Sequence, residues 1–176
     1  DSTRPYGGGD DQLGAMPEGA FSAAVSSPPY EANDQRGGHT QVALEKRVAT
    51  YGYGETDGNM GNDTGDTFWS AAHIIVAQTH AALRPSGHAV WIVKSFVRNK
   101  TLVDFPGQWR ELCESIGFVT LHEHHAMLVD DKGTQTAIDG NHKQHKTERK
   151  SFFRRLAEKK GSPRIDFETV LCMVKL

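Results

Sequence analysis

Two kinds of apolar pattern alternate along this chain, and together they predict a sheet with helices packed against it. Residues 21–26 and 88–94 are short, almost unbroken apolar runs, which are typical of strands buried on both faces. Residues 118–129 and 169–175 are two further apolar stretches of strand length. Polar, glycine-rich sequence separates these runs, so we expect four strands with long connections between them.

Two stretches between the strands have the periodicity of amphipathic helices. Residues 67–83 repeat apolar side chains every three or four positions, and Asp66 or Thr67 can cap the first turn. Residues 105–116 follow the same pattern, with Asp104 as the expected cap and a glycine after the last turn. The expected inner faces hold Phe68, Trp69, Ala72, Val76, Trp109, Leu112, Cys113 and Ile116.

The order of these elements is strand, helix, strand, helix, strand, strand, and it predicts a single α/β domain. Strand–helix–strand units favour parallel neighbours with right-handed crossovers. The last two strands are expected to pair antiparallel at the edge of the sheet. Residues 31–66 are a long polar loop that directly follows the first strand. Loops of this length are usually functional or mobile, so it could close over a ligand or be a flexible, disordered insert.

Composition narrows the class of protein further. The chain has 176 residues, 37% of them hydrophobic, and a net charge of −2, so attraction to a polyanion must come from a local patch. Cys113 and Cys172 are far apart in sequence and lie in apolar surroundings, which indicates buried thiols in a reducing cytoplasm. No run approaches a membrane span, and no signal peptide is visible. The first residue is Asp1 rather than methionine, which indicates a fragment or missing ends.

The first strand runs into Ser27-Pro28-Pro29-Tyr30, and this corner carries the candidate chemistry. Each proline lacks an N–H and fixes its φ angle, so the chain must leave the sheet in a stiff turn with outward carbonyls. Two fixed acceptors can bind both hydrogens of an exocyclic amino group, while an aromatic ring stacks on the attached base. Fixed acceptors that draw the nitrogen toward tetrahedral geometry restore its lone pair for attack.

The tetrapeptide resembles the (Ser/Asp/Asn)-Pro-Pro-(Tyr/Phe/Trp) motif of the amino-group DNA methyltransferases. These enzymes use S-adenosylmethionine to methylate N4 of cytosine or N6 of adenine. A second segment, Leu83-x-Pro85-x-Gly87, is similar to their Leu-(Lys/Arg)-Pro-Gly-Gly sequence, with Ser86 in place of the first glycine. The resemblance runs from residue 21 to residue 176. It implies a Rossmann-like methyltransferase sheet, mostly parallel with an antiparallel edge strand, in a partial or permuted domain.

The resemblance also implies roles for individual residues. Ser27 and the carbonyls of Pro28 and Pro29 would accept the amino hydrogens, and Tyr30 would stack on a base flipped out of DNA. Serine in the first position leans toward cytosine over adenine as the target. Ser27, Phe68 and Trp69 are the candidate residues beside the cofactor, but for the two aromatic residues a core role is the favoured interpretation.

Residues 147–160 are predicted to form a basic helix within a DNA-facing segment that spans residues 141–164. The stretch from Lys146 to Lys160 has seven cations against two carboxylates, and phosphate contact is the favoured interpretation over a solvated helix. The expected DNA-binding residues are Arg149, Lys150, Arg154, Arg155, Lys159 and Lys160.

The sequence His122-Glu123-His124-His125 is not expected to bind a metal. Alternate residues of a strand lie on opposite faces, so at most two of these side chains converge.

The chain departs from the family in one respect. The glycine-rich strand-to-helix turn that holds the cofactor's methionine moiety is not found, and Asp104-Phe105-Pro106-Gly107 lacks its second glycine. The first hypothesis is therefore a DNA amino-methyltransferase, complete or partial, as in restriction–modification systems or phage genomes. The second is a methyltransferase-like nucleic-acid-binding module without its own cofactor loop. A third is an RNA or protein-glutamine methyltransferase.

Overall fold

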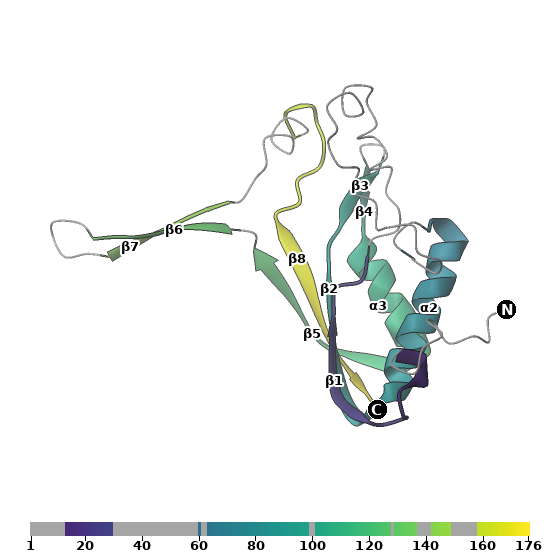
Figure 1. The fold of residues 1–176 in the computed structure, drawn as a ribbon. Coiled ribbons are helices and arrows are strands. Elements are labelled where there is room, and N and C mark those ends of the chain that lie inside the picture. Colours follow the sequence, from purple (N-terminus) through teal and green to yellow (C-terminus); the bar gives the residue numbers. More distant parts are fainter. Residues whose placement is uncertain are drawn as a thin grey trace, which may run out of the picture.

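A computed structural model describes residues 13–29, 60, 63–98, 101–127, 129–136, 142–148 and 158–176. Within these ranges the chain forms a four-stranded sheet with two helices against it, plus two small two-stranded sheets (Figure 1). The elements in chain order are η1 (Leu13–Ala15), β1 (Phe21–Ser26), α2 (Gly65–Ala82), β2 (Leu83–Val93), β3 (Phe96–Arg98), β4 (Thr101–Val103), α3 (Phe105–Ile116), β5 (Phe118–Met127), β6 (Val129–Thr136), β7 (His142–Glu148) and β8 (Phe167–Lys175).

The main sheet has the strand order β1-β2-β8-β5. β1 and β2 are parallel neighbours joined through α2, as the sequence predicted. β8 is antiparallel to both β2 and β5, so β1, β2 and β5 share one direction. The predicted antiparallel pair of last strands is confirmed, but β8 lies inside the sheet and β5 takes the edge, so the single reversed strand is not an edge strand.

Side-chain polarity explains why β8 takes the inner position. Leu171 and Met173 are fully buried toward the helices. β5 instead carries an exposed run from His122 to His125. Apolar strands gain most from a central position, and charged or polar strands are better tolerated at an edge, where they also discourage pairing with other chains.

β1 is more exposed than a strand buried on both faces. Val25 is 68% exposed and Phe21 is 42% exposed, so the expectation of a doubly buried strand is wrong in the described part of the chain. The reason is position: β1 pairs with β2 on one side, and no other described strand pairs with its outer edge. The two helices cover one face of the sheet only (Figure 1). On the other face Val25, Val90 and Cys172 form a row across β1, β2 and β8.

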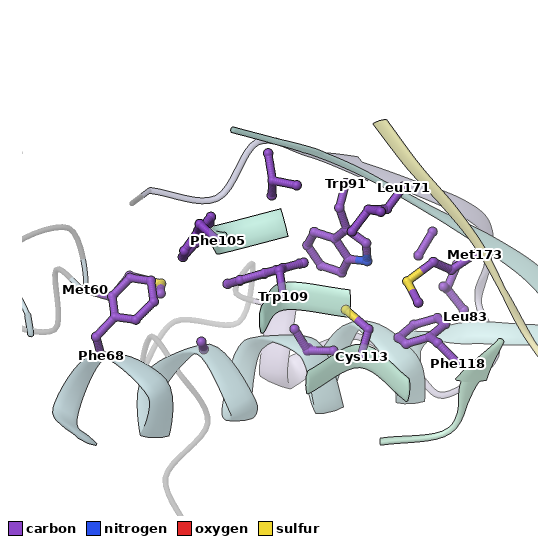
Figure 2. Close-up of a cluster of buried hydrophobic side chains, with 14 of the residues drawn as sticks. Met60, Phe68, Leu83, Trp91, Phe105, Trp109, Cys113, Phe118, Leu171 and Met173 are labelled. Carbon is purple, nitrogen blue, oxygen red and sulfur yellow. The ribbon is translucent and has the colours of Figure 1, made fainter. Parts of the chain in front are cut away.

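The core is a layer of aromatic side chains between the helices and the sheet (Figure 2). Trp109 of α3 is fully buried at its centre, with its ring 5.5 Å from that of Trp91 and 5.7 Å from that of Phe105. Phe68 of α2 is also fully buried, and Met60 packs into the same cluster. These contacts fix α2 and α3 against β2 and thereby fix the end of β1 beside it.

The observed ends of α3 agree with the prediction, whereas the observed start of α2 differs from it. Gly117 ends α3 in a left-handed conformation with φ of 117°. α2 begins at Gly65, two residues before the predicted start, and its N-cap position is Thr64 without a side-chain cap hydrogen bond. Asp66 therefore lies in the first turn rather than at the cap. There its carboxylate faces the positive end of the helix dipole.

The cap of α3 provides a stability test. The Asp104 carboxylate accepts a hydrogen bond from the Gly107 backbone N–H at 3.1 Å. We expect Asp104→Ala to lower the free energy of unfolding by about 1 kcal/mol, whereas Asp104→Ser should retain most of it. Urea denaturation followed by circular dichroism measures both. Equal stability of all three proteins would contradict a capping role.

A second test concerns His80, at the C-terminal end of α2. Lys175 Nζ donates hydrogen bonds to the carbonyls of His80 and Leu83, each at 2.8 Å, and the His80 ring packs edge-on against Phe118. Burial, and secondarily the charge of Lys175, lower the pKa of His80 below its ordinary value of 6.5, although the backbone of Gly117 partly opposes this. The unfolded chain therefore takes up this proton more readily than the folded chain.

It follows that the stability contributed by His80 is fully present above about pH 6.5 and is lost as the pH falls through the folded-state pKa. We expect the urea midpoint to fall between pH 7.5 and pH 5.5, and His80→Gln to remove part of that fall. His73→Gln, an exposed position on the same helix, is the matched control. An identical pH dependence in wild type and His80→Gln would exclude the effect.

Two stretches expected as irregular connections contain strands. β3 and β4 pair within residues 95–104, and β6 and β7 form a long ribbon within residues 129–148. β7 includes Thr147 and Glu148, so the predicted basic helix does not begin at residue 147. Residues 149–157 lie outside the described residues, as does most of the predicted loop at 31–66. None of the described helices is both long and apolar enough to cross a membrane.

Candidate functional site

The corner after β1 is anchored to the neighbouring strand through a side chain. The Ser27 hydroxyl donates a hydrogen bond to the backbone carbonyl of Ile92 on β2, with 3.1 Å between the two oxygens. Ser26 pairs in register with Trp91, so the parallel register brings Ser27 beside Ile92. Because the proton of the hydroxyl is used in this bond, the lone pairs of Ser27 Oγ stay available as acceptors.

The first strand ends where the sequence predicts, at Ser26, directly before the diproline corner. Ser27 is exposed, Pro28 is buried and Pro29 is half-buried, so one proline holds the corner in place while its two neighbours reach the surface. Tyr30 lies outside the described residues, and its stacking role stays a prediction.

Several elements gather at the sheet edge where this corner lies. β1, β2 and β5 run in the same direction, so their C-terminal ends share one edge, and β8 starts there. The β3–β4 hairpin follows the end of β2, and the β6–β7 ribbon follows the end of β5 (Figure 1). In α/β sheets, ligands bind outside the carboxyl ends of the strands. The corner therefore occupies the usual place for a binding site.

The two aromatic residues proposed to lie beside the cofactor differ in exposure. Phe68 is fully buried and contacts Trp69 and Phe105, with ring centroids 5.2 Å and 6.0 Å away, which gives it the core role (Figure 2). Trp69 is half-buried, with its ring 5.8 Å from Phe105 and 6.5 Å from Trp109. Of the pair, Trp69 has the side chain that is partly open to a ligand.

Of the residues expected to bind DNA, the structure describes only the last two, Lys159 and Lys160. Lys159 and Lys160 are exposed, shortly before β8 begins at the edge that holds the corner. The other four expected DNA-binding residues, Arg149, Lys150, Arg154 and Arg155, lie outside the described residues. Their contact with DNA stays a prediction.

The histidine run on β5 follows the alternation expected of a strand. His122 and His124 lie side by side, with ring centroids 5.9 Å apart. His125 Nε2 instead lies 3.5 Å from Glu123 Oε1, and Glu123 accepts a hydrogen bond from Arg110. Among the described residues, no three potential ligands converge on one point.

The two cysteines differ in their surroundings. Cys113 is buried in the core, as expected, and burial together with the nearby Glu114 raises the pKa of its thiol to about 12. A thiol with this pKa is not a nucleophile near neutral pH. Cys172 is half-buried on the sheet face that the helices leave open, so its expected burial is only partial in the described structure.

The second motif, at Leu83–Gly87, has a structural role at the far end of β2. A Cβ atom on Gly87 would lie 2.7 Å from the backbone oxygen of Arg84, so only glycine fits, and Ser86 has φ of 61°. This irregular turn coincides with the register shift that moves the partner of β1 from Leu83 to His88. The motif therefore sets the β1–β2 register, which in turn places Ser27 beside Ile92.

Sequence reasoning missed the Ile92 carbonyl as a partner of the corner. A backbone acceptor on another strand leaves no trace in residue type, and its position depends on the register of two strands joined through α2. The signal available was indirect. Ser27 stands one residue beyond the apolar run, which is where a hydroxyl meets the neighbouring strand rather than the core.

Comparison with known proteins finds solved structures with a similar fold. No protein-family model matches the chain, and no curated protein matches its sequence. Two crystal structures of TTHA0409 from Thermus thermophilus, a candidate DNA modification methylase, superpose with TM-scores of 0.51 and 0.50 at 14% and 16% sequence identity. A third, complexed with S-adenosyl-L-methionine, has a TM-score of 0.49 at 17% identity.

The coverage of the first two matches is uneven. Each covers 93% of this chain but only 48% or 49% of the methylase, so the chain spans about half the length of the structures it matches. Sequence identities this low leave the resemblance at the level of architecture. The chain thus has a mixed α/β fold that is similar to one half of a candidate DNA modification methylase.

Proposed function

We propose that this chain carries the target-base half of an S-adenosylmethionine-dependent methyltransferase that acts on an exocyclic amino group in DNA. The observation that carries the proposal is the anchored Ser27-Pro28-Pro29 corner at the carboxyl end of β1. It is supported by a fold similar to that of a candidate DNA modification methylase. Cytosine N4 is the favoured target and adenine N6 the alternative, because serine begins the motif.

The corner would act by holding acceptors in fixed positions. Ser27 Oγ and the proline carbonyls would accept the two amino hydrogens and hold the nitrogen with its lone pair pointing away from the ring. Held in this way, the nitrogen would be positioned to attack the methyl group that S-adenosylmethionine would supply, and the proton released from the nitrogen would pass to water. Rigid placement matters most, because orientation and preorganised polar groups supply much of the rate in transfers of this kind.

DNA would reach the site as a duplex with one base extruded. The net charge of the chain is −2, so phosphate binding needs local cations. Lys159 and Lys160 are exposed and precede β8, which starts at the relevant sheet edge, and Arg149, Lys150, Arg154 and Arg155 precede them in sequence. We propose that these six residues contact the DNA backbone and that Tyr30 stacks on the extruded base.

We propose that Ser27 and Trp69 form one wall of a cofactor site. Ser27 is exposed at the strand end, and Trp69 offers a partly open ring at the start of α2. S-adenosylmethionine would supply the methyl group. The sequence shows no glycine-rich turn of the family's form to hold the rest of it, and we propose that residues beyond Ser27 and Trp69 form the opposite wall.

The absence of a recognisable glycine-rich cofactor turn leaves room for a second candidate function, a methyltransferase-like nucleic-acid-binding module that needs another segment for activity. Two observations favour it: the outer edge of β1 pairs with no described strand, and the chain spans about half of the matched methylase.

Transfer of tritium from labelled S-adenosylmethionine to DNA tests the proposal, with Pro29→Ala as the inactive control. Methyl transfer by the wild-type chain would exclude the nucleic-acid-binding module, whereas calorimetry that shows no cofactor binding would favour it.

Competition between DNA and RNA tests the third hypothesis, since methyl transfer by an RNA enzyme would be inhibited more strongly by RNA than by DNA.

A further inference from the structure

The histidine run on β5 contains a side chain that the proposed site does not use. His125 stacks on Phe167 of β8, with the ring centroids 4.0 Å apart and the ring planes at 19°. The His125 side chain is nevertheless 54% exposed, and Phe167 is half-buried. Because Phe167 covers one face of the imidazole, the exposed area of the imidazole lies on its edges and its outer face. The two rings therefore form a flat aromatic surface that is open to solvent.

The strand register fixes the face of the sheet on which this aromatic surface lies. His125 pairs with Thr169 and Met127 pairs with Phe167, so these four side chains share one face, and Glu168 alternates to the other. Thr169 is buried, which identifies the shared face as the one that the helices cover. β5 is the edge strand of the described sheet, so His125 lies at the rim of the covered face.

The same register places His125 at the level of the diproline corner. The Ile92 carbonyl accepts the hydrogen bond from the corner, and the next residue, Val93, pairs with Thr169, which in turn pairs with His125. The corner and the imidazole thus lie at the same edge of the sheet, three strand spacings apart, which is about 14 Å. One turn of B-DNA is about 34 Å long, so a duplex bound along this edge can contact both points.

The charges beside the stacked rings are paired. His125 Nε2 lies 3.5 Å from Glu123 Oε1, and Glu123 accepts a hydrogen bond from Arg110 at 3.1 Å. Just before β8, Asp166 pairs with Arg164 at 2.9 Å. Glu123 contacts the imidazole at its edge, through a ring nitrogen, so this contact leaves the outer face of the ring open. Each of these two carboxylates is compensated by an arginine, which reduces its repulsion of phosphates.

A stacked aromatic surface of this kind suits a flat partner. Every nucleobase has a π face, so bases stack on aromatic side chains whatever the sequence. A phosphate would instead need available cations, and Arg110 and Arg164 each pair with a carboxylate. A paired base inside a duplex is already stacked on its neighbours, so the partner must be an unpaired base. Extrusion of a target base opens such a place in the duplex.

We infer that His125, backed by Phe167, stacks on an unpaired nucleobase of the DNA that this chain binds, at a point separate from the diproline corner. This inference rests on the proposed action on DNA. The stacked base would hold the opened DNA at the carboxyl edge of the sheet, while the corner holds the target base.

Binding to an opened duplex tests the inference in the full chain. The probe is a DNA duplex with a few unpaired bases at its centre, which supplies unpaired bases without a known recognition sequence. Fluorescence anisotropy should show at least about fivefold weaker binding for His125→Ala than for wild type. His125→Phe keeps an aromatic ring against Phe167 and should bind within about twofold of wild type. The matched control is His124→Ala, which removes an exposed histidine from the opposite face of β5 and should also bind within about twofold.

The same probe with abasic sites at its centre separates stacking from other roles. This probe keeps the phosphates and lacks the unpaired bases, so wild type and His125→Ala should bind it with affinities that differ by less than about twofold. An equal loss of affinity on both probes would indicate phosphate contact or a disturbed fold and would overturn the inference. Circular dichroism and urea denaturation check that the three variants fold.

The outcomes distinguish the inference from the function on which it rests. If wild type binds the opened duplex and His125→Ala binds it equally well, the stacking inference fails and the proposed function stands. The same holds if His125→Phe loses as much affinity as His125→Ala, because stacking depends on the ring. If wild type binds no DNA and transfers no methyl group to it, the proposed function fails and the inference fails with it.

Discussion

Ser27→Ala should lower the rate of methyl transfer to DNA by about 10²–10³-fold, the range for removing one preorganised polar group from a reacting centre. The substitution removes an acceptor for the amino hydrogens and breaks the hydrogen bond to the Ile92 carbonyl, which is 3.1 Å long. Both losses act at the same point, because the bond to β2 is what orients the hydroxyl oxygen. Single-turnover assays with saturating cofactor measure the chemical step directly.

The chain offers a matched control one residue earlier. Ser26 is also exposed but ends β1 in register with Trp91, so Ser26→Ala should keep the rate within about threefold of wild type. Ser27→Thr retains the hydroxyl and should recover part of the lost rate. A Ser27→Ala protein with the wild-type rate would show that the hydroxyl takes no part, and the corner would then act through its carbonyls alone.

Trp109→Ala is expected to have the largest effect on stability, a loss of about 3–5 kcal/mol in the free energy of unfolding. The side chain is fully buried and packs its ring against those of Trp91 and Phe105 (Figure 2). The ring of Trp69 lies 6.5 Å away. Removing it leaves a large cavity at the point where α3 meets the sheet. Urea denaturation monitored by circular dichroism gives the difference, because tryptophan fluorescence would itself change.

Trp109→Phe separates packing from hydrogen bonding. The Trp109 indole N–H is buried without a hydrogen-bond partner in the described structure, so phenylalanine removes an unsatisfied donor while keeping most of the aromatic volume. We expect it to cost less than about 1.5 kcal/mol. A cost equal to that of alanine would mean that the indole N–H has a partner that the structure does not describe.

Local signals predicted the parts of the fold that depend on short stretches of sequence. The end of β1 at the diproline corner follows from the geometry of proline, and α3 follows from Asp104, its apolar spacing and Gly117. Each of these needs information from a few neighbouring residues. The parallel pairing of β1 with β2 also followed, since strand–helix–strand crossovers have few topologies.

The features that sequence reasoning missed depend on distant neighbours. Either β5 or β8 could take the edge of the sheet beyond β2. β5 takes it because its exposed histidines are tolerated there, and β8 therefore lies between β2 and β5. The sequence of the β6–β7 ribbon predicts a loop, because a strand pair without apolar alternation gives no strand signal. The exposure of Val25 depends on which elements pack beside β1, and the sequence of β1 does not contain that information.

The sheet face that the described helices leave open has a consequence for how this chain behaves in solution. Valine side chains and a thiol lie in a row across β1, β2 and β8, next to the edge of β1 that pairs with no described strand. Such a surface is a template for further strands, because each added strand gains both a backbone ladder and apolar contact. The polypeptide is therefore expected to self-associate through this surface.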